Sequence, residues 1–148
     1  MTDEDFIREA IKEAEFAKQA GEWPFGAVIV KDGKIIARGA CDESSTKNVL
    51  GHAELRAISA ACTALQTNNL AGCAIYATNE PCLMCASAII QAKISTVVFS
   101  LKRADLAHIL RQRNLNIHHL AADAGYEVEI TSGVLKEEAL KLFNGVKK

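Results

Sequence analysis

Two short clusters of metal-ligating residue types constrain how this chain can fold, because side chains that bind one ion must meet in space. The first cluster is His52 beside Glu54, and the second, farther along the chain, is Cys82 and Cys85 behind Pro81. Imidazole and thiolate groups suit Zn²⁺, and three protein ligands with one open position are typical of a catalytic zinc site. The sequence therefore predicts that His52, Cys82 and Cys85 converge on one zinc ion.

Each cluster is expected to open a helix. Cys82 and Cys85 lie at i and i+3 and would share one helical face. Residues 52 and 54 do not share a face, so their spacing indicates a helix that points end-on at the metal. The unpaired N–H groups of a helix N-terminus favour thiolate and hydroxide. Glu54 is then predicted to take a proton from a zinc-activated water and to deliver it to a ring nitrogen and to the leaving amine.

Each cluster has a second interpretation. Cys-x-x-Cys alone is also found in redox pairs and in half of a zinc knot. A structural zinc site would need a fourth protein ligand, and none of the other histidines or cysteines stands at a ligand spacing from the two clusters. Glu54 alone could be a helix-capping acid, and Cys62 and Cys73 fit apolar core positions.

The remaining pattern predicts alternating strands and helices. Thr2 and Asp5 can cap a first helix that ends at Gly21, and Asp32-Gly33 indicates a hairpin. Strands are expected at residues 25–30, 35–38, 73–78, 96–100 and 126–131. Helices are expected at 52–65, 82–92 and 135–143, with an irregular helix at 102–115 and a loop at 41–51. Strands separated by helices tend to lie parallel, so the predicted fold is α/β with a mixed five-stranded sheet flanked by helices.

Length and composition indicate a single domain that spans residues 1–148. A chain of 148 residues that is 49% hydrophobic can bury one sizeable core. The net charge of -1 provides no global field toward polyphosphate or an anionic bilayer. The acidic residues 1–10 do not resemble a secretory signal, and no apolar run reaches the roughly 20 residues that cross a bilayer. We therefore expect a soluble, cytoplasmic protein whose five cysteines are thiols, ligands or core.

The two motifs together resemble one branch of the cytidine deaminase superfamily, which holds tRNA adenosine deaminases, guanine deaminases and fungal cytosine deaminases. The resemblance runs from residues 21–26 to the C-terminus. Residues 52–54 and 80–86 match the two motifs, and residues 127–135 resemble the closing strand and helix of the tRNA enzymes. It implies a three-layer α/β/α fold, one catalytic zinc per subunit, usually a homodimer, and a backbone N–H near Ala53 that binds a ring carbonyl.

Two departures from that branch bear on the substrate. Cys41 stands where the branch usually has an Asn, and residues 100–108 replace a glycine-rich segment of the tRNA enzymes. With the near-neutral charge, these departures favour hydrolytic deamination of a small nucleobase or nucleoside, such as guanine or cytosine. The alternative is a tRNA anticodon adenosine deaminase, and a further alternative is a non-catalytic zinc-stabilised interaction domain. Phe25 and Cys41 are expected either to line the substrate pocket or to be core.

Charged residues after the fourth predicted strand also allow two interpretations. Asp105 could meet a base N–H or lie on a solvated helix face. A basic group could be an RNA-facing patch or, more simply, a solvated face; its members are Lys102, Arg103, Arg111 and Arg113.

Overall fold

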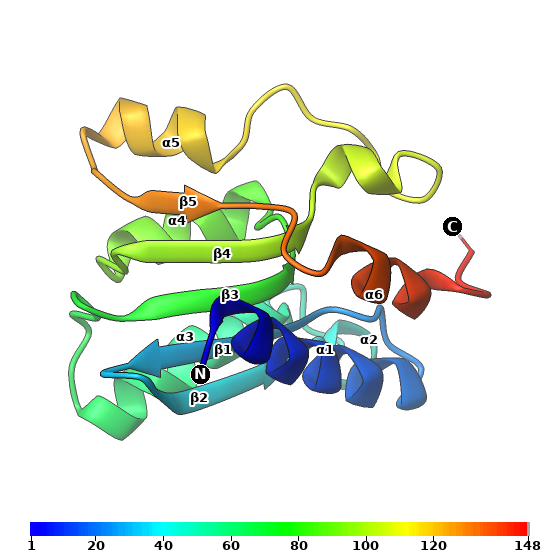
Figure 1. Cartoon of the computed structure of the whole chain (residues 1–148), viewed down its shortest axis with the longest axis horizontal. Helices are drawn as coiled ribbons and strands as arrows, with labels where there is room; N and C mark the ends of the chain where they lie inside the picture. The colour runs from blue at the N-terminus through cyan, green and yellow to red at the C-terminus, as the bar shows by residue number, and fades with distance from the viewer. Residues whose placement is uncertain (148) are drawn as a thin grey trace.

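A five-stranded sheet runs through the computed structural model, which describes residues 1–147 (Figure 1). The strands, in the order β2-β1-β3-β4-β5, are β1 (Gly26–Lys31), β2 (Lys34–Ala40), β3 (Ala74–Asn79), β4 (Thr96–Leu101) and β5 (Glu129–Thr131). β1 is antiparallel to β2 and β3, whereas β3 and β4, like β4 and β5, pair in parallel. The predicted mixed five-stranded sheet is confirmed.

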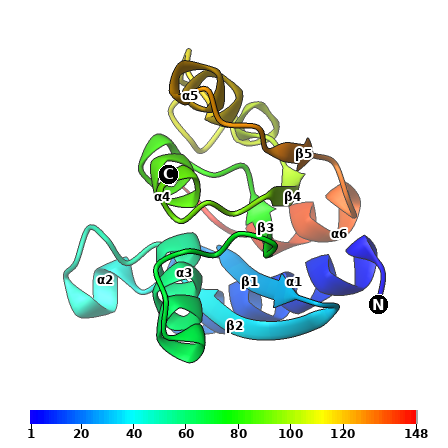
Figure 2. The same ribbon diagram turned by 90° about the vertical axis from the view of Figure 1, so that its left-hand side faces the viewer.

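Helices cover both faces of this sheet. They are α1 (Asp3–Gln19), α2 (Glu43–Thr46), α3 (Ala53–Leu65), α4 (Leu83–Gln91), α5 (Ile117–Ala124) and α6 (Lys136–Leu140), with 3₁₀ helices η1 (Arg103–Leu106) and η2 (Lys141–Phe143). Figure 2 shows α1 and α6 on one side of the sheet and α3, α4 and α5 on the other. The three-layer arrangement is therefore confirmed. Among the described helices, none is both long and apolar enough to cross a bilayer.

Local signals explain the N-terminal elements. The Thr2 side chain accepts a hydrogen bond from the Asp5 N–H, and the Asp5 carboxylate accepts one from the Thr2 N–H, which makes a capping box for α1. Asp32 and Gly33 have φ values of 51° and 75°. Positive φ at both central residues is the requirement of a type I′ turn, whose twist matches that of the strands it joins. The hairpin of β1 and β2 follows from this turn.

The core is divided by the sheet into two layers. Alternate residues of β1 face opposite sides, so Ala27 and Ile29 pack toward α3 and α4, whereas Val28 and Val30 pack toward α1 and α6. The inner face of α3 is made of small residues without solvent exposure: Ala53, Ala57 and Ala61. Small side chains let this helix lie close to the sheet, which fixes where its first turn ends up.

Gly39 marks the closest approach between β2 and α3. A Cβ atom at this position would collide with the Ala53 carbonyl oxygen and the Ala57 nitrogen, both in the backbone of α3. Glycine is therefore needed for packing rather than for backbone conformation. The contact seats the first turn of α3, the turn that carries Glu54, directly against the edge of the sheet.

The segment from residue 102 to residue 131 differs from the sequence-based prediction. The irregular helix expected at 102–115 is wrong: only η1 forms there, and Arg103 Nε donates to the Arg111 carbonyl oxygen at 2.6 Å across a loop. The apolar spacing arises because Leu106 and Ile109 are buried in the layer of α1 and α6. Helix α5, which was not predicted, begins at the Asn116 cap.

Two further boundaries need correction. The region 41–51, expected to be a loop, contains the four-residue helix α2. The strand expected at 126–131 pairs with β4 only from Glu129 to Thr131. The backbone before it closes α5 instead, since the Tyr126 N–H donates to the Ala121 carbonyl oxygen at 2.9 Å.

Replacing Gly39 with alanine should destabilise the protein by about 1–3 kcal/mol, because the new Cβ atom must push β2 and α3 apart. Urea denaturation followed by circular dichroism measures this change. Ser59→Ala, on the exposed face of α3, is the matched control and should change the free energy of unfolding by less than about 0.5 kcal/mol. Equal stability of the Gly39→Ala and wild-type proteins would contradict the packing argument.

Candidate zinc site and catalytic cavity

The N-termini of α3 and α4 meet at the carboxyl end of the sheet. His52 is the N-cap residue of α3, and Cys82 is the N-cap residue of α4. The Cys82 sulfur accepts a hydrogen bond from the Cys85 N–H at 3.5 Å. Both clusters therefore stand at helix beginnings, as predicted, where the helix dipoles favour negative charge.

The side chains of His52, Cys82 and Cys85 converge on one point. Nδ1 of His52 lies 3.5 Å from the sulfur of Cys82 and 3.5 Å from the sulfur of Cys85. The ligand atoms of these residues all lie within 4.8 Å of one another, and they form the one such group of potential metal ligands among residues 1–147. One imidazole and two thiols are a donor set that Zn²⁺ takes readily, so these residues fit a zinc ion.

The two sulfurs are electrostatically unequal. A hydrogen bond from the Cys85 thiol, together with His52, lowers the pKa of Cys82 to about 4. The same hydrogen bond and burial raise the pKa of Cys85. The low pKa of Cys82 favours its thiolate form, and a hydrogen bond from His52 to Cys82 raises the pKa of His52. Such a cluster has the negative charge that a cation requires.

Glu54 lies in the first turn of α3 next to this cluster. Its side chain is buried, and the residue is only 8% exposed. Burial, and then the negative charge of Cys82, raises the pKa of Glu54 to about 7. A carboxyl group with a pKa near neutral can both accept and donate a proton, which is the property required of a proton carrier.

A cavity of about 250 Å³ opens onto the cluster and is lined in part by His52, Glu54 and Cys82. The structure places Phe25 and Cys41 in its wall. Ala53 is fully buried at the first residue of α3. The cavity is smaller than the roughly 300–1,000 Å³ of pockets that take drug-sized ligands.

Several lining residues were not identified from the sequence. Trp23 stacks beside Phe25 with ring centroids 6.0 Å apart and an interplanar angle of 7°. Trp23 lies within residues 21–26, where the resemblance to the deaminase branch begins, and that position could have indicated a role at the site. Glu43 and Asn79 also line the cavity, but their sequence context carries no motif that indicates it.

The charged residues around η1 have specific roles. Arg103 lines the cavity, and its backbone N–H donates to Glu80 Oε1 at 3.0 Å. Asp105 is occupied elsewhere: its carboxylate accepts from the Lys102 N–H at 2.8 Å and lies 3.1 Å from Lys136 Nζ. The carboxylate of Asp105 therefore secures the loop after β4.

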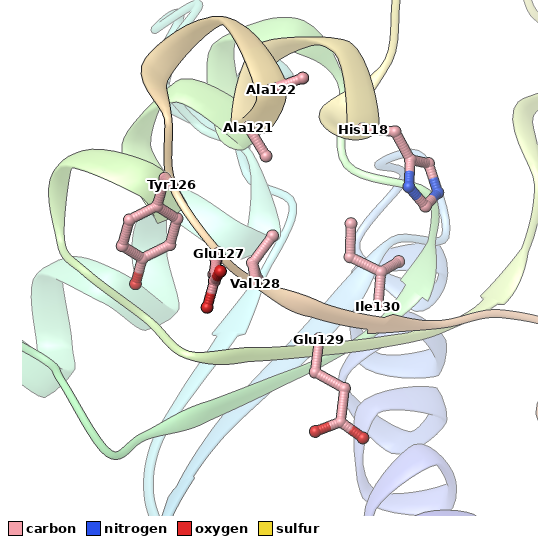
Figure 3. A pocket seen from close by; sticks show the side chains of 8 residues that line it. All are labelled: His118, Ala121, Ala122, Tyr126, Glu127, Val128, Glu129 and Ile130. Carbon is pink, nitrogen blue, oxygen red and sulfur yellow. The ribbon is translucent and has the colours of Figure 1, made fainter.

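A second, larger hollow of about 460 Å³ lies between α5 and the chain that enters β5. Figure 3 shows Val128 and Ile130 turned toward α5 and Glu129 turned away from it. The hollow shares no lining residue with the cavity beside His52. His52, Glu54 and Cys82 therefore line the smaller cavity and not this hollow.

Comparison with known proteins agrees with this site. The family model described as the cytidine and deoxycytidylate deaminase zinc-binding region matches residues 1–101. The chain belongs to this family. Membership makes the protein a zinc-dependent hydrolytic deaminase. The predicted zinc cofactor and the predicted superfamily branch are confirmed.

Relatives in this deaminase family act on different substrates. A tRNA-specific adenosine deaminase of Aquifex aeolicus (strain VF5) is 35% identical over 150 residues, which cover 99% of this chain and 99% of the relative. A structure from a study of A-to-I editing by tRNA:A34 deaminases has a TM-score of 0.81 at 29% identity and covers 93% of this chain and 98% of its own. The structure of guanine deaminase from Bacillus subtilis has a TM-score of 0.71 at 32% identity, covering 84% and 94%.

The zinc-free deaminase should lose stability as the pH rises from about 4.5 to about 7 because of Glu54. Its pKa is raised from 4.5 to about 7, so in this window the folded state keeps a proton that the unfolded state has released. Raising the pH then favours unfolding. Chemical denaturation at several pH values measures the effect, with Glu54→Gln as the reference without this titration. A pH-independent difference between the two proteins would contradict the assignment.

Proposed function

We propose that this deaminase converts adenosine to inosine in the anticodon loop of a tRNA. The similarity to a tRNA-specific adenosine deaminase over 99% of both chains, at 35% identity, carries the proposal. Such similarity includes the C-terminal residues 127–135, which lie beyond the family match at residues 1–101. The finding favours the tRNA substrate over the small free base that the sequence departures indicated.

The cavity supports recognition of one extruded base. A target base in a loop can leave its stack and enter a pocket, where aromatic side chains hold its face. Phe25 and Trp23, which both line the cavity, are the side chains proposed for this role. Stacking of this kind contributes about 1–3 kcal/mol per base. The remainder of the tRNA would stay outside a cavity of about 250 Å³.

The proposed chemistry assigns ligand roles to His52, Cys82 and Cys85 and a proton-carrying role to Glu54. Zinc, when bound, supplies Lewis acidity that lowers the pKa of a water to about 7. Glu54 takes one proton of the attacking water, whose oxygen bonds to the ring carbon. Glu54 then delivers that proton to the ring nitrogen. It next takes the proton of the new hydroxyl group and passes it to the amino nitrogen, so that the carbon–nitrogen bond breaks as the carbonyl forms. The products are inosine and ammonia.

Free guanine is the second candidate substrate. Burial raises the pKa of the Cys41 thiol, so the cavity wall has a neutral thiol where the resembling branch usually has an amide. A thiol is a poor hydrogen-bonding substitute for that amide. In this candidate, the loss of the amide is offset by the Ala53 backbone N–H, which would bind the ring carbonyl that guanine has and adenine lacks. The guanine deaminase structure, similar at 32% identity, supports this candidate.

A substrate comparison separates the two candidates. We expect the zinc-loaded protein to form inosine in tRNA, detected by nucleoside mass spectrometry, and to release ammonia from tRNA rather than from free bases. Binding should weaken steeply with salt, because phosphate contacts release counterions. Ammonia released from guanine and none from tRNA would replace the first proposal with the second. The homodimer that the resemblance implies stays a prediction, which light scattering checks.

Glu54→Gln should retain zinc but lower kcat/KM by about 10²–10⁴, because an amide cannot carry the proton. Elemental analysis measures the zinc and an ammonia assay measures the rate. Cys82→Ala is the contrasting variant, since loss of a ligand should lower the zinc content itself. Near wild-type turnover of Glu54→Gln would refute the role assigned to this carboxylate.

A further inference from the structure

The carboxylate of Glu43 faces the ring nitrogen of His52 that points away from the two cysteines. Glu43 Oε2 lies 3.4 Å from His52 Nε2, whereas Nδ1 of the same ring faces the sulfurs of Cys82 and Cys85. A neutral imidazole has one N–H donor and one acceptor nitrogen. If Nδ1 binds the metal, the N–H must be on Nε2, which is the nitrogen that faces the carboxylate.

The helix that carries Glu43 is too short to fix this carboxylate by itself. Helix α2 has four residues. Its first turn is held by Glu22, a buried acid whose carboxylate accepts hydrogen bonds from the N–H groups of Ser44 at 2.8 Å and Ser45 at 2.7 Å. Glu22 lies in the connection between α1 and β1, so a residue distant in the sequence fixes the position of α2.

A second clamp ties the preceding residue to α3. Arg56 Nε donates to Asp42 Oδ1 at 2.9 Å. Arg56 follows His52 by one helical turn, and its N–H donates to the His52 carbonyl oxygen at 3.0 Å. Asp42, next to Glu43, is therefore bound to the same helix that has His52 as its N-cap. The two clamps together hold Glu43 opposite the imidazole ring.

We propose that Glu43 is a positioning residue that accepts the Nε2–H of His52 and thereby keeps Nδ1 presented to zinc, with Glu22 holding Glu43 in place. Partners of this kind fix the tautomer and the orientation of a ligating histidine and strengthen metal binding. The inference rests on the proposed ligand roles of His52, Cys82 and Cys85. It assigns a purpose to the buried acid Glu22, which has no part in the proposed proton transfers.

Zinc affinity measured by competition with a chromogenic chelator tests this proposal without relying on activity. Glu43→Ala should raise the dissociation constant for zinc by about 10-fold, at the lower end of the range for such partners. The lower end is expected because solvent screens this contact: the side chain of His52 is 29% exposed and that of Glu43 is 41% exposed. Glu43→Gln should retain most of the affinity, since its amide oxygen can still accept the Nε2–H.

Glu22→Gln tests whether the buried acid acts through Glu43. This variant should weaken zinc binding less than Glu43→Ala does. In a Glu43→Ala background its effect should disappear, because two residues that act through one contact are not additive. A Glu22→Gln effect that persists in that background would show that Glu22 does not act through Glu43.

Controls separate positioning from other causes of weaker binding. Glu15→Ala removes one negative charge from an exposed position of α1 and should leave the zinc affinity unchanged. Circular dichroism of each zinc-free variant verifies the fold. Wild-type protein that binds no zinc would overturn both the ligand assignment and this inference. Two outcomes would overturn this inference alone, provided that the wild-type protein binds zinc. In the first, Glu43→Ala binds zinc as tightly as the wild type. In the second, Glu43→Gln binds zinc as weakly as Glu43→Ala.

Discussion

The structure depends on the convergence of two helix beginnings at one end of a sheet. Helices α3 and α4 follow β2 and β3, two strands that are not neighbours but both pair with β1. This topology brings His52 and Cys82 together although the sequence separates them. The helix dipoles and the unpaired N–H groups then favour the negative charge of the thiolate at their junction. A deaminase site of this kind is a property of the whole sheet rather than of either motif.

Packing at the back of α3 is as important as the ligands themselves. The alanines on its inner face and the absence of a side chain at Gly39 let the backbone of α3 lie directly against β2. Larger residues would move the axis outward and would carry His52 and Glu54 with it. The pKa of Glu54 depends on the same packing, because burial is the main cause of its increase.

The sequence predicted the elements with strong local signals and missed those determined by distant contacts. The hairpin at Asp32-Gly33 and the helices that begin at the two motifs follow from turn chemistry and residue spacing. The region 102–115 misled the prediction because its apolar residues belong to a loop and are still buried in the core. The Arg103 side chain holds the backbone of this loop. Glu43 was missed for a similar reason: the helix that carries it is held by contacts of Glu22 with Ser44 and of Arg56 with Asp42, which residue spacing does not indicate. Periodicity contains no information about contacts of that kind.

The three ligand side chains come from two separate chain segments, and this separation links metal binding to folding. An unfolded chain would have to close a long loop to bring His52 to the two cysteines, so it would bind zinc far more weakly than the folded chain does. By mass action, every increase in free zinc above its dissociation constant then adds to the stability of the native state. The resistance of the folded protein to heat and to proteases therefore rises with the concentration of free zinc around it.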